Sequence, residues 1–178
     1  MTIFLSGGAK NGKSSLAQDL AVRLPDGGPR FYVATMIPVD EEDRERIRRH
    51  VADRAGLGFE TVECGRDILS CLDRADPGGS FLVDSATALL MNEMFRDGIV
   101  DERAGERCAG ELAEFVRSVK NAVIVSDGIY CDAGRYDEIT EFYRRSLALV
   151  DRTLARVCDT VIEMAAGRQI IYKGGLPE

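Results

Sequence analysis

A glycine-rich loop near the start of the chain is the feature that most restricts its fold. Residues 7–14 read GGAKNGKS and fit the pattern G-x-x-x-x-G-K-[S/T] at every fixed position. They follow a short apolar run at residues 2–6 and precede a segment with helical spacing at residues 14–24. In such a strand–loop–helix unit, glycines let successive backbone N–H groups point at phosphate oxygens, and the helix N-terminus adds its positive end. The pattern, placed between a strand and a helix, predicts a phosphate-binding loop. The alternative is a glycine-rich turn that matches the pattern by chance, and such a turn would not need a strand before it and a helix after it.

The residue types in the loop predict how a nucleotide would bind. Lys13 is expected to reach the β- and γ-phosphates as a point charge, and Ser14 to place its hydroxyl on Mg²⁺. The loop contacts phosphates only, so it does not distinguish ATP from GTP. The nucleotide-binding residues expected here are Gly7, Gly8, Ala9, Lys10, Asn11, Gly12, Lys13, Ser14 and Ser15.

The rest of the chain alternates apolar strand-like runs with helical segments. Strands are expected at residues 2–6, 31–35, 59–64, 80–84, 122–126, 160–164 and 169–172. Helices are expected at residues 14–24, 40–54, 66–74, 102–120 and 137–157, with another between residue 84 and Phe95. This alternation predicts an α/β fold of three layers, a P-loop NTPase-like arrangement with a mostly parallel sheet. The tight connection at residues 165–167 predicts an antiparallel C-terminal strand, and we expect residues 1–178 to form a single domain.

Composition excludes several classes of protein. The chain is 45% hydrophobic and 30% charged, as in a globular domain, and no apolar run reaches the roughly 18 residues of a membrane helix. The formal net charge of −7 argues against nonspecific binding to nucleic acid or anionic membranes. The five cysteines are scattered and odd in number, which indicates reduced packing residues rather than a disulfide framework or a zinc site. We therefore expect a cytoplasmic protein that neither spans a membrane nor binds nucleic acid.

Two carboxylates end apolar strands of the expected sheet. Asp84 closes the run at residues 80–84, where a carboxylate can hold Mg²⁺ directly or through water, although it could instead cap the following helix. Asp127 follows the run at residues 122–126 and is either a second functional acid or a turn residue before Gly128. Ser14 and Asp84 are thus the expected metal ligands.

The chain has a single histidine, His50, in the highly charged segment 40–54. On a helix, Arg46, His50 and Arg54 would share one face, because they are four residues apart. An imidazole between two guanidiniums could receive a phosphoryl group. A solvated charged helix with an unremarkable surface histidine explains the same spacing. The segment is so polar that we expect it to pack weakly against the rest of the fold.

Three segments together resemble the bifunctional adenosylcobinamide kinase / adenosylcobinamide-phosphate guanylyltransferase family of cobalamin biosynthesis. The loop at residues 7–14 is similar to the family's Gly-Gly-Ala-Arg-Ser-Gly-Lys-Ser. Residues 46–54, followed by the extended residues 59–63, resemble its Arg-Ile-x-x-His-x-x-x-Arg helix and next segment. Residues 81–84 leading to Asn92 resemble its strand that ends in an acid before a helix carrying Asn. Generic phosphate-loop kinases lack the histidine segment, so that segment is the most specific of the three.

The resemblance implies two reactions and a set of site residues. The enzyme would phosphorylate the aminopropanol hydroxyl of adenosylcobinamide with ATP or GTP, and would then transfer GMP from GTP to that phosphate through a GMP–histidine intermediate. The residue that matches the family's histidine is His50, with Lys13 as the second catalytic residue, Arg46 and Arg54 as nucleotide ligands, and Mg²⁺ as cofactor. A RecA-like sheet and a homotrimer are also implied.

The sequence departs from the family at two places. Where the family has Thr-Asn-Glu-Val-Gly after a strand, this chain has residues 126–130, SDGIY, so that an acidic group remains but is shifted by one position. Its Gly-x-x-Asn-Gln corresponds here to residues 148–152, ALVDR. These differences could alter the pocket for the large, amide-decorated corrinoid, the kinase activity or the trimer contacts. They leave open another P-loop small-molecule kinase, in which His50 would have no role, and a non-catalytic nucleotide-binding relative.

Overall fold

A computed structural model describes residues 1–25, 28–130 and 133–177. The chain alternates strands and helices as the sequence predicts. In order, the elements are β1 (Thr2–Gly7), α1 (Lys13–Arg23), β2 (Arg30–Ala34), α2 (Glu41–Asp53), β3 (Phe59–Glu63), η1 (Ile68–Asp73), β4 (Ser80–Asp84), α3 (Ala86–Met94), η2 (Arg96–Gly98), α4 (Ala104–Ser118), β5 (Asn121–Val125), α5 (Glu138–Val157), β6 (Thr160–Ala165) and β7 (Arg168–Lys173). The helix expected at residues 66–74 is present only as the short 3₁₀ helix η1.

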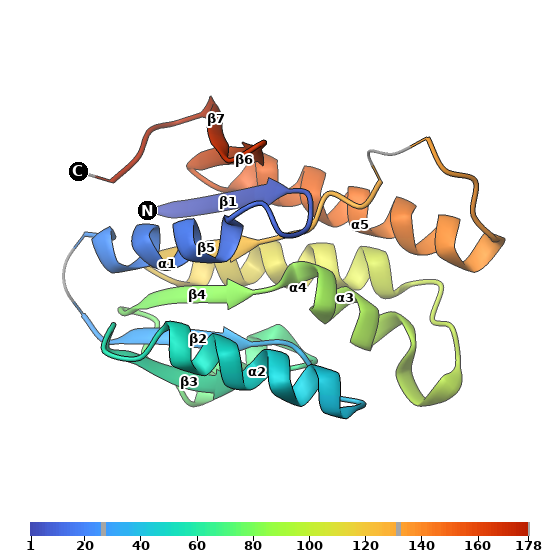
Figure 1. The fold of residues 1–178 in the computed structure, drawn as a ribbon, viewed down its shortest axis with the longest axis horizontal. Coiled ribbons are helices and arrows are strands. Elements are labelled where there is room, and N and C mark those ends of the chain that lie inside the picture. Colours follow the sequence, from blue (N-terminus) through green and yellow to red (C-terminus); the bar gives the residue numbers. More distant parts are fainter. Residues whose placement is uncertain (26–27, 131–132, 178) are drawn as a thin grey trace.

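One seven-stranded sheet runs through the molecule in the order β3-β2-β4-β5-β1-β6-β7 (Figure 1). All neighbouring strands are parallel except β6 and β7, which pair antiparallel. The predicted α/β class, the mostly parallel sheet and the antiparallel C-terminal strand are therefore confirmed. Because the parallel strands all point the same way, the loops that follow β1, β2, β4 and β5 meet at one edge of the sheet.

Helices cover both faces of the sheet, which gives the three layers. Alternation along β1 separates the two cores: Ile3 and Leu5 pack with Leu20 of α1, whereas Phe4 packs with α3, α4 and α5 through residues such as Leu112. The aromatic rings of Phe31, Phe81 and Phe115 extend this second core. Leu147, Val150 and Leu154 of α5 are buried as expected, and Phe142 packs partly buried against the same core.

Four cysteines, Cys64, Cys71, Cys108 and Cys158, are buried free thiols, in agreement with a packing role. Cys131 lies outside the described residues. None of the helices in the described part of the chain is long and apolar enough to cross a membrane.

Candidate active site

A cavity of about 910 Å³ opens at the sheet edge where the parallel strands end. Its volume is typical of ligand pockets. The phosphate loop, the end of β4, the segment after β2 and one side of α2 enclose it. It brings together most of the sequence-predicted site residues, namely Ala9, Lys10, Asn11, Gly12, Lys13, Ser14, Ser15, Arg46, His50, Arg54, Asp84 and Asp127. Gly7 and Gly8 lie in the same loop but line a second cavity.

Contacts with the end of β6 stabilise the conformation of the phosphate loop. The Asn11 amide donates to the Met164 carbonyl at 2.6 Å, and the Asn11 side-chain oxygen accepts from the Lys13 backbone N–H. A side chain on Gly7 would collide with the Met164 carbonyl, and Gly12 takes a positive φ of 91° as the residue before α1. These two positions need glycine, because L-residues with a Cβ rarely adopt that backbone or that close approach.

Lys13 sits at the start of α1 with its ammonium already engaged. Its side chain is only 6% exposed, and Nζ donates to the Gly8 carbonyl at 2.6 Å. Nζ also forms an ion pair with Asp127 Oδ1 at 2.8 Å. A phosphate that binds in the loop therefore has to take over an ammonium group that Asp127 now neutralises.

The end of β5 and a backbone hydrogen bond hold Asp127 in position. β5 places it beside the phosphate loop because β5 pairs directly with β1. Its N–H donates to the Thr87 hydroxyl of α3 at 2.8 Å. Asp127 is the acidic residue that is shifted by one position relative to the family motif. In the structure its carboxylate pairs with Lys13 of the phosphate loop. A simple turn role would not require this contact.

Asp84 ends β4 and faces the same cavity. Its Oδ2 accepts from the Tyr32 hydroxyl at 2.9 Å, and the following residue, Ser85, caps α3 through its hydroxyl. The helix-cap alternative for Asp84 is therefore wrong. Burial, together with the neighbouring Asp84 carboxylate, raises the pKa of Tyr32, so the phenol remains a hydrogen-bond donor to Asp84.

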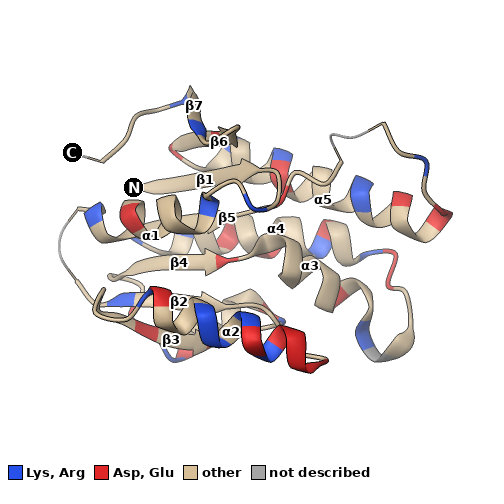
Figure 2. Ribbon diagram, in the orientation of Figure 1, with Lys and Arg blue, Asp and Glu red and all other residues tan. Residues whose placement is uncertain are grey.

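Helix α2 owes its stability to charges and capping rather than to packing. Asp40 accepts from the Asp43 N–H as the N-cap, and acidic residues fill the first turn, where the helix dipole favours them. Figure 2 shows the charged residues along α2, with most of the acidic ones at its start. None of its residues is buried, as the polarity of the segment predicts.

The face of α2 that carries His50 is turned toward the cavity. His50 Nδ1 lies 3.8 Å from Asp84 Oδ2, and its side chain is 31% exposed. Arg46 lies one turn earlier, half exposed, with a loose ion pair to Glu42 at 3.8 Å. The predicted shared face is therefore present, and it brings the imidazole to the carboxylate at the end of β4. At 3.8 Å the two atoms are close but too far apart for a hydrogen bond.

Arg54, at the C-terminal end of α2, is fixed more firmly than the sequence suggests. Its guanidinium lies 4.0 Å from the centre of the Tyr32 ring and donates to the Thr61 hydroxyl at 2.9 Å. Only 8% of Arg54 is exposed. This stacking anchors the end of α2 on the side of the sheet that α1 covers, because Tyr32 belongs to that core.

Sequence reasoning missed Tyr32 and Thr61 because both occur in apolar or alternating strands, where they look like ordinary sheet residues. Their position two residues from the ends of β2 and β3 is the only signal that could have placed them near the cavity.

The donor set suits Mg²⁺. Ser14 and Asp84 both line the cavity and offer a hydroxyl and a carboxylate, the oxygen ligands that Mg²⁺ prefers. Within the described residues no cluster of three or more His, Cys, Asp or Glu side chains could hold a metal. A magnesium ion here would depend on these two side chains, phosphate oxygens and water, as is usual for Mg²⁺ at nucleotide sites.

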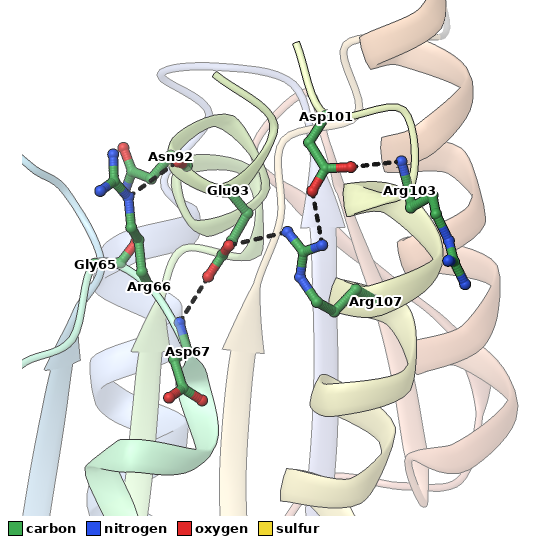
Figure 3. A network of polar contacts seen from close by, with 8 residues as sticks. All are labelled: Gly65, Arg66, Asp67, Asn92, Glu93, Asp101, Arg103 and Arg107. Atoms are coloured by element: carbon green, nitrogen blue, oxygen red, sulfur yellow. Dashed lines mark hydrogen bonds and ion pairs between the residues drawn. The ribbon is translucent and has the colours of Figure 1, made fainter. Parts of the chain in front are cut away.

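A buried polar network supports the far wall of the cavity (Figure 3). Glu93, 3% exposed, accepts from the Asp67 N–H at 2.7 Å and pairs with Arg107 at 3.1 Å. Its neighbour Asn92 donates to the carbonyls of Thr35 and Gly65. Through these contacts α3 fixes the segment after β3, including Gly65, which lines the cavity. The Asn on this helix, part of the family resemblance, thus has a structural role.

We expect Glu93→Ala to lower the free energy of unfolding by about 2–3 kcal/mol, because it removes the acceptor of a buried N–H and the partner of Arg107. Urea denaturation measures this. Glu102→Ala removes an exposed carboxylate from the nearby loop and should change stability by less than about 0.5 kcal/mol. Equal effects of the two variants would contradict the role given to the network.

Comparison with known families identifies the chain. The sequence profile of the family described as cobinamide kinase / cobinamide phosphate guanyltransferase matches residues 3–171. The chain belongs to this family. Membership in the cobinamide kinase / guanyltransferase family supports a nucleotide-dependent transferase of cobalamin biosynthesis, and it agrees with the resemblance carried by the loop, the His50 helix and the end of β4. A search of curated protein sequences found no significant match.

Solved structures support the fold. A protein of Pyrococcus horikoshii OT3 is 10% identical, with a TM-score of 0.56 over 97% of this chain and 86% of that chain. An ATPase domain is 11% identical, with a TM-score of 0.53 over 97% of this chain and 76% of that domain. An ATPase from the type III secretion system of pathogenic bacteria is 13% identical, with a TM-score of 0.50 over 92% of this chain and 51% of that chain. These similarities concern the fold alone and confirm the P-loop NTPase-like class.

Proposed function

We propose that this member of the cobinamide kinase / guanyltransferase family carries out both reactions of the family description. It phosphorylates the hydroxyl of adenosylcobinamide with ATP or GTP, and it then transfers GMP from GTP to the product through a covalent GMP–histidine at His50. The observation that carries the proposal is the position of His50: it lies in the same cavity as Lys13 and within 3.8 Å of Asp84. A kinase without a guanylyl step would not need an imidazole there.

The kinase reaction depends on the phosphate loop. Lys13 exchanges its contact with Asp127 for oxygens of the β- and γ-phosphates, and the backbone N–H groups of the loop hold the remaining charge. Mg²⁺ bound by Ser14 and Asp84 would neutralise charge on the phosphates. The acceptor hydroxyl then attacks the γ-phosphorus and releases its proton to solvent, the bond to the β-phosphate oxygen breaks, and the electron pair leaves with the nucleoside diphosphate.

The guanylyl reaction proceeds in two displacements. With the proton on Nδ1, which faces Asp84, His50 presents the lone pair of Nε2. Nε2 attacks the α-phosphorus of GTP, the bond to the β-phosphate oxygen breaks, and pyrophosphate leaves with the electron pair. Asp84 offsets the positive charge that develops on the ring. An oxygen of adenosylcobinamide phosphate then attacks the same phosphorus and breaks the N–P bond, which regenerates the imidazole.

Asp84 can serve both steps because its two oxygens have different neighbours. Tyr32 and His50 both contact Oδ2, so we assign the metal contact to Oδ1. Arg46 is loosely paired and half exposed, and it is the α2 cation that we assign to the phosphates of GTP. Arg54 acts by holding the end of α2 on Tyr32.

The test is product analysis by liquid chromatography and mass spectrometry with adenosylcobinamide, Mg²⁺ and either ATP or GTP. We expect adenosylcobinamide phosphate with each nucleotide and adenosyl-GDP-cobinamide with GTP alone. Phosphorylation without any guanylyl product would favour the main alternative, a P-loop kinase in which His50 has no role. Nucleotide binding without either product would favour a non-catalytic relative.

A further inference from the structure

A second cavity, of about 390 Å³, lies where α5 meets the β1 and β6 strands. Gly7 and Gly8, the first residues of the phosphate loop, line it, whereas residues 9–15 line the nucleotide cavity. Gly128, the residue after Asp127, also lines the second cavity, and its N–H donates to the Gly7 carbonyl at 3.1 Å. The two cavities therefore meet at the loop residues and the Asp127–Gly128 segment.

Asp151 of α5 lines this second cavity and is one of the most buried carboxylates in the described residues, with 3% exposed. The Tyr130 hydroxyl donates to Asp151 Oδ2 at 2.7 Å. The other oxygen, Oδ1, is buried and has no hydrogen-bond partner among the described residues. Burial raises the pKa of Asp151 to about 6, against the lowering effects of the Tyr130 hydroxyl and of the Ser126 hydroxyl, which pairs with Thr87 and forms no hydrogen bond with Asp151 among the described residues. A buried acceptor without a donor is costly, so its presence beside a cavity indicates a ligand that supplies one.

We propose that the second cavity is the acceptor subsite of the kinase reaction, where Asp151 Oδ1 accepts an N–H from a carboxamide at the edge of the acceptor. This inference rests on the proposed function and deepens it. Apart from Asp151, the charged residues that line the cavity are Arg152 and Glu163, whose opposite charges offset each other, so a neutral carboxamide fits better than a charged group. With a volume of about 390 Å³ the cavity accepts a peripheral side chain of a large acceptor rather than the whole molecule.

The position of the subsite suits phosphoryl transfer. Gly8 lines the cavity, and its carbonyl accepts from Lys13 Nζ, the group that would hold the terminal phosphate. Asp127 contacts the same ammonium, and its charge raises the pKa of Asp151. An acceptor anchored at Asp151 thus lies beside the phosphate that it receives, as a direct transfer requires.

Asp151→Asn tests the subsite. The variant keeps the shape and an oxygen for Tyr130 but presents an N–H₂ group where the ligand needs an acceptor. We expect the KM for adenosylcobinamide to rise about 10- to 100-fold, because a hydrogen bond to a charged group is lost, while the KM for GTP changes less than about twofold. An acceptor analogue with carboxylates in place of carboxamides should be a poor substrate of the wild type, and the variant should discriminate less against it.

Glu111→Gln is the matched control. Glu111 of α4 also has a buried oxygen without a partner among the described residues and a pKa raised by burial, but it lines neither cavity. It should leave the KM for adenosylcobinamide unchanged. An unchanged acceptor KM in Asp151→Asn, or an equal rise in both variants, would overturn the proposal.

A binding measurement separates this proposal from the proposed function. If the wild type does not phosphorylate adenosylcobinamide, the proposed function fails, and a titration of ¹⁵N-labelled protein with propionamide decides the subsite alone. We expect shifts of the Gly8 and Gly128 amide resonances in the wild type, smaller shifts in Asp151→Asn, and no response to methylammonium. The absence of shifts in the wild type, or a response to methylammonium in place of propionamide, contradicts the carboxamide subsite.

Discussion

His50→Asn is expected to lower the rate of GMP transfer by at least about 10³-fold, because it removes the atom that forms the covalent bond to the α-phosphorus. The kinase rate should fall by less than about tenfold, since His50 takes no part in γ-phosphoryl transfer. Isotope exchange between pyrophosphate and GTP measures the first displacement without any corrinoid. Formation of adenosylcobinamide phosphate from ATP measures the kinase reaction separately.

A neighbour on the same helix provides the control for this prediction. Arg49 is 67% exposed, does not line the cavity, and among the described residues forms only a long ion pair, 4.0 Å, with Glu45. Arg49→Ala should leave exchange and phosphorylation near the wild-type rates. If exchange persisted at the wild-type rate in His50→Asn, the nucleophile would have to be another group, and the role of α2 would be electrostatic.

Lys13→Ala is expected to reduce both reactions by about 10²–10³-fold, because the ammonium stabilises charge on the phosphates in each transition state. Nucleotide affinity should fall as well, which fluorescence titration with a labelled GTP measures. The loss of both reactions distinguishes this variant from His50→Asn, whose effect is confined to guanylyl transfer.

Asp127→Asn serves as the counterpart of Lys13→Ala. It removes the carboxylate that pairs with Lys13 at 2.8 Å and keeps the lysine, so GTP should bind as tightly as in the wild type or more tightly. Weaker Mg²⁺-dependent GTP binding in Asp127→Asn would show instead that Asp127 contributes to the metal site.

The parts of the site that sequence alone predicted are those defined by a short stretch of consecutive residues. The phosphate loop needs only a strand, an eight-residue motif with four fixed positions and a helix, and Asp84 is marked by the end of an apolar strand. The shared face of Arg46 and His50 follows from helical periodicity, although periodicity could not show that this face turns toward the cavity. The family resemblance supplied that expectation, because it implies that His50 forms a bond to the nucleotide.

The parts that sequence did not predict depend on contacts between distant elements. The Lys13–Asp127 pair exists because β5 lies next to β1, a neighbour relation that no local pattern encodes. Tyr32 looked like a core aromatic until its hydroxyl was found on Asp84. Asp151 lies in the segment 148–152 that departs from the family, but only packing shows that it is buried beside a cavity.

The most direct test of the account is the intact mass of the protein after incubation with GTP and Mg²⁺ at neutral to alkaline pH, which protects a phosphoramidate. His50→Asn is treated in parallel. We predict a gain of one guanylyl group in the wild type and none in the variant. A wild type that binds GTP yet gains no mass, or an adduct that persists in His50→Asn, would contradict the covalent role of His50.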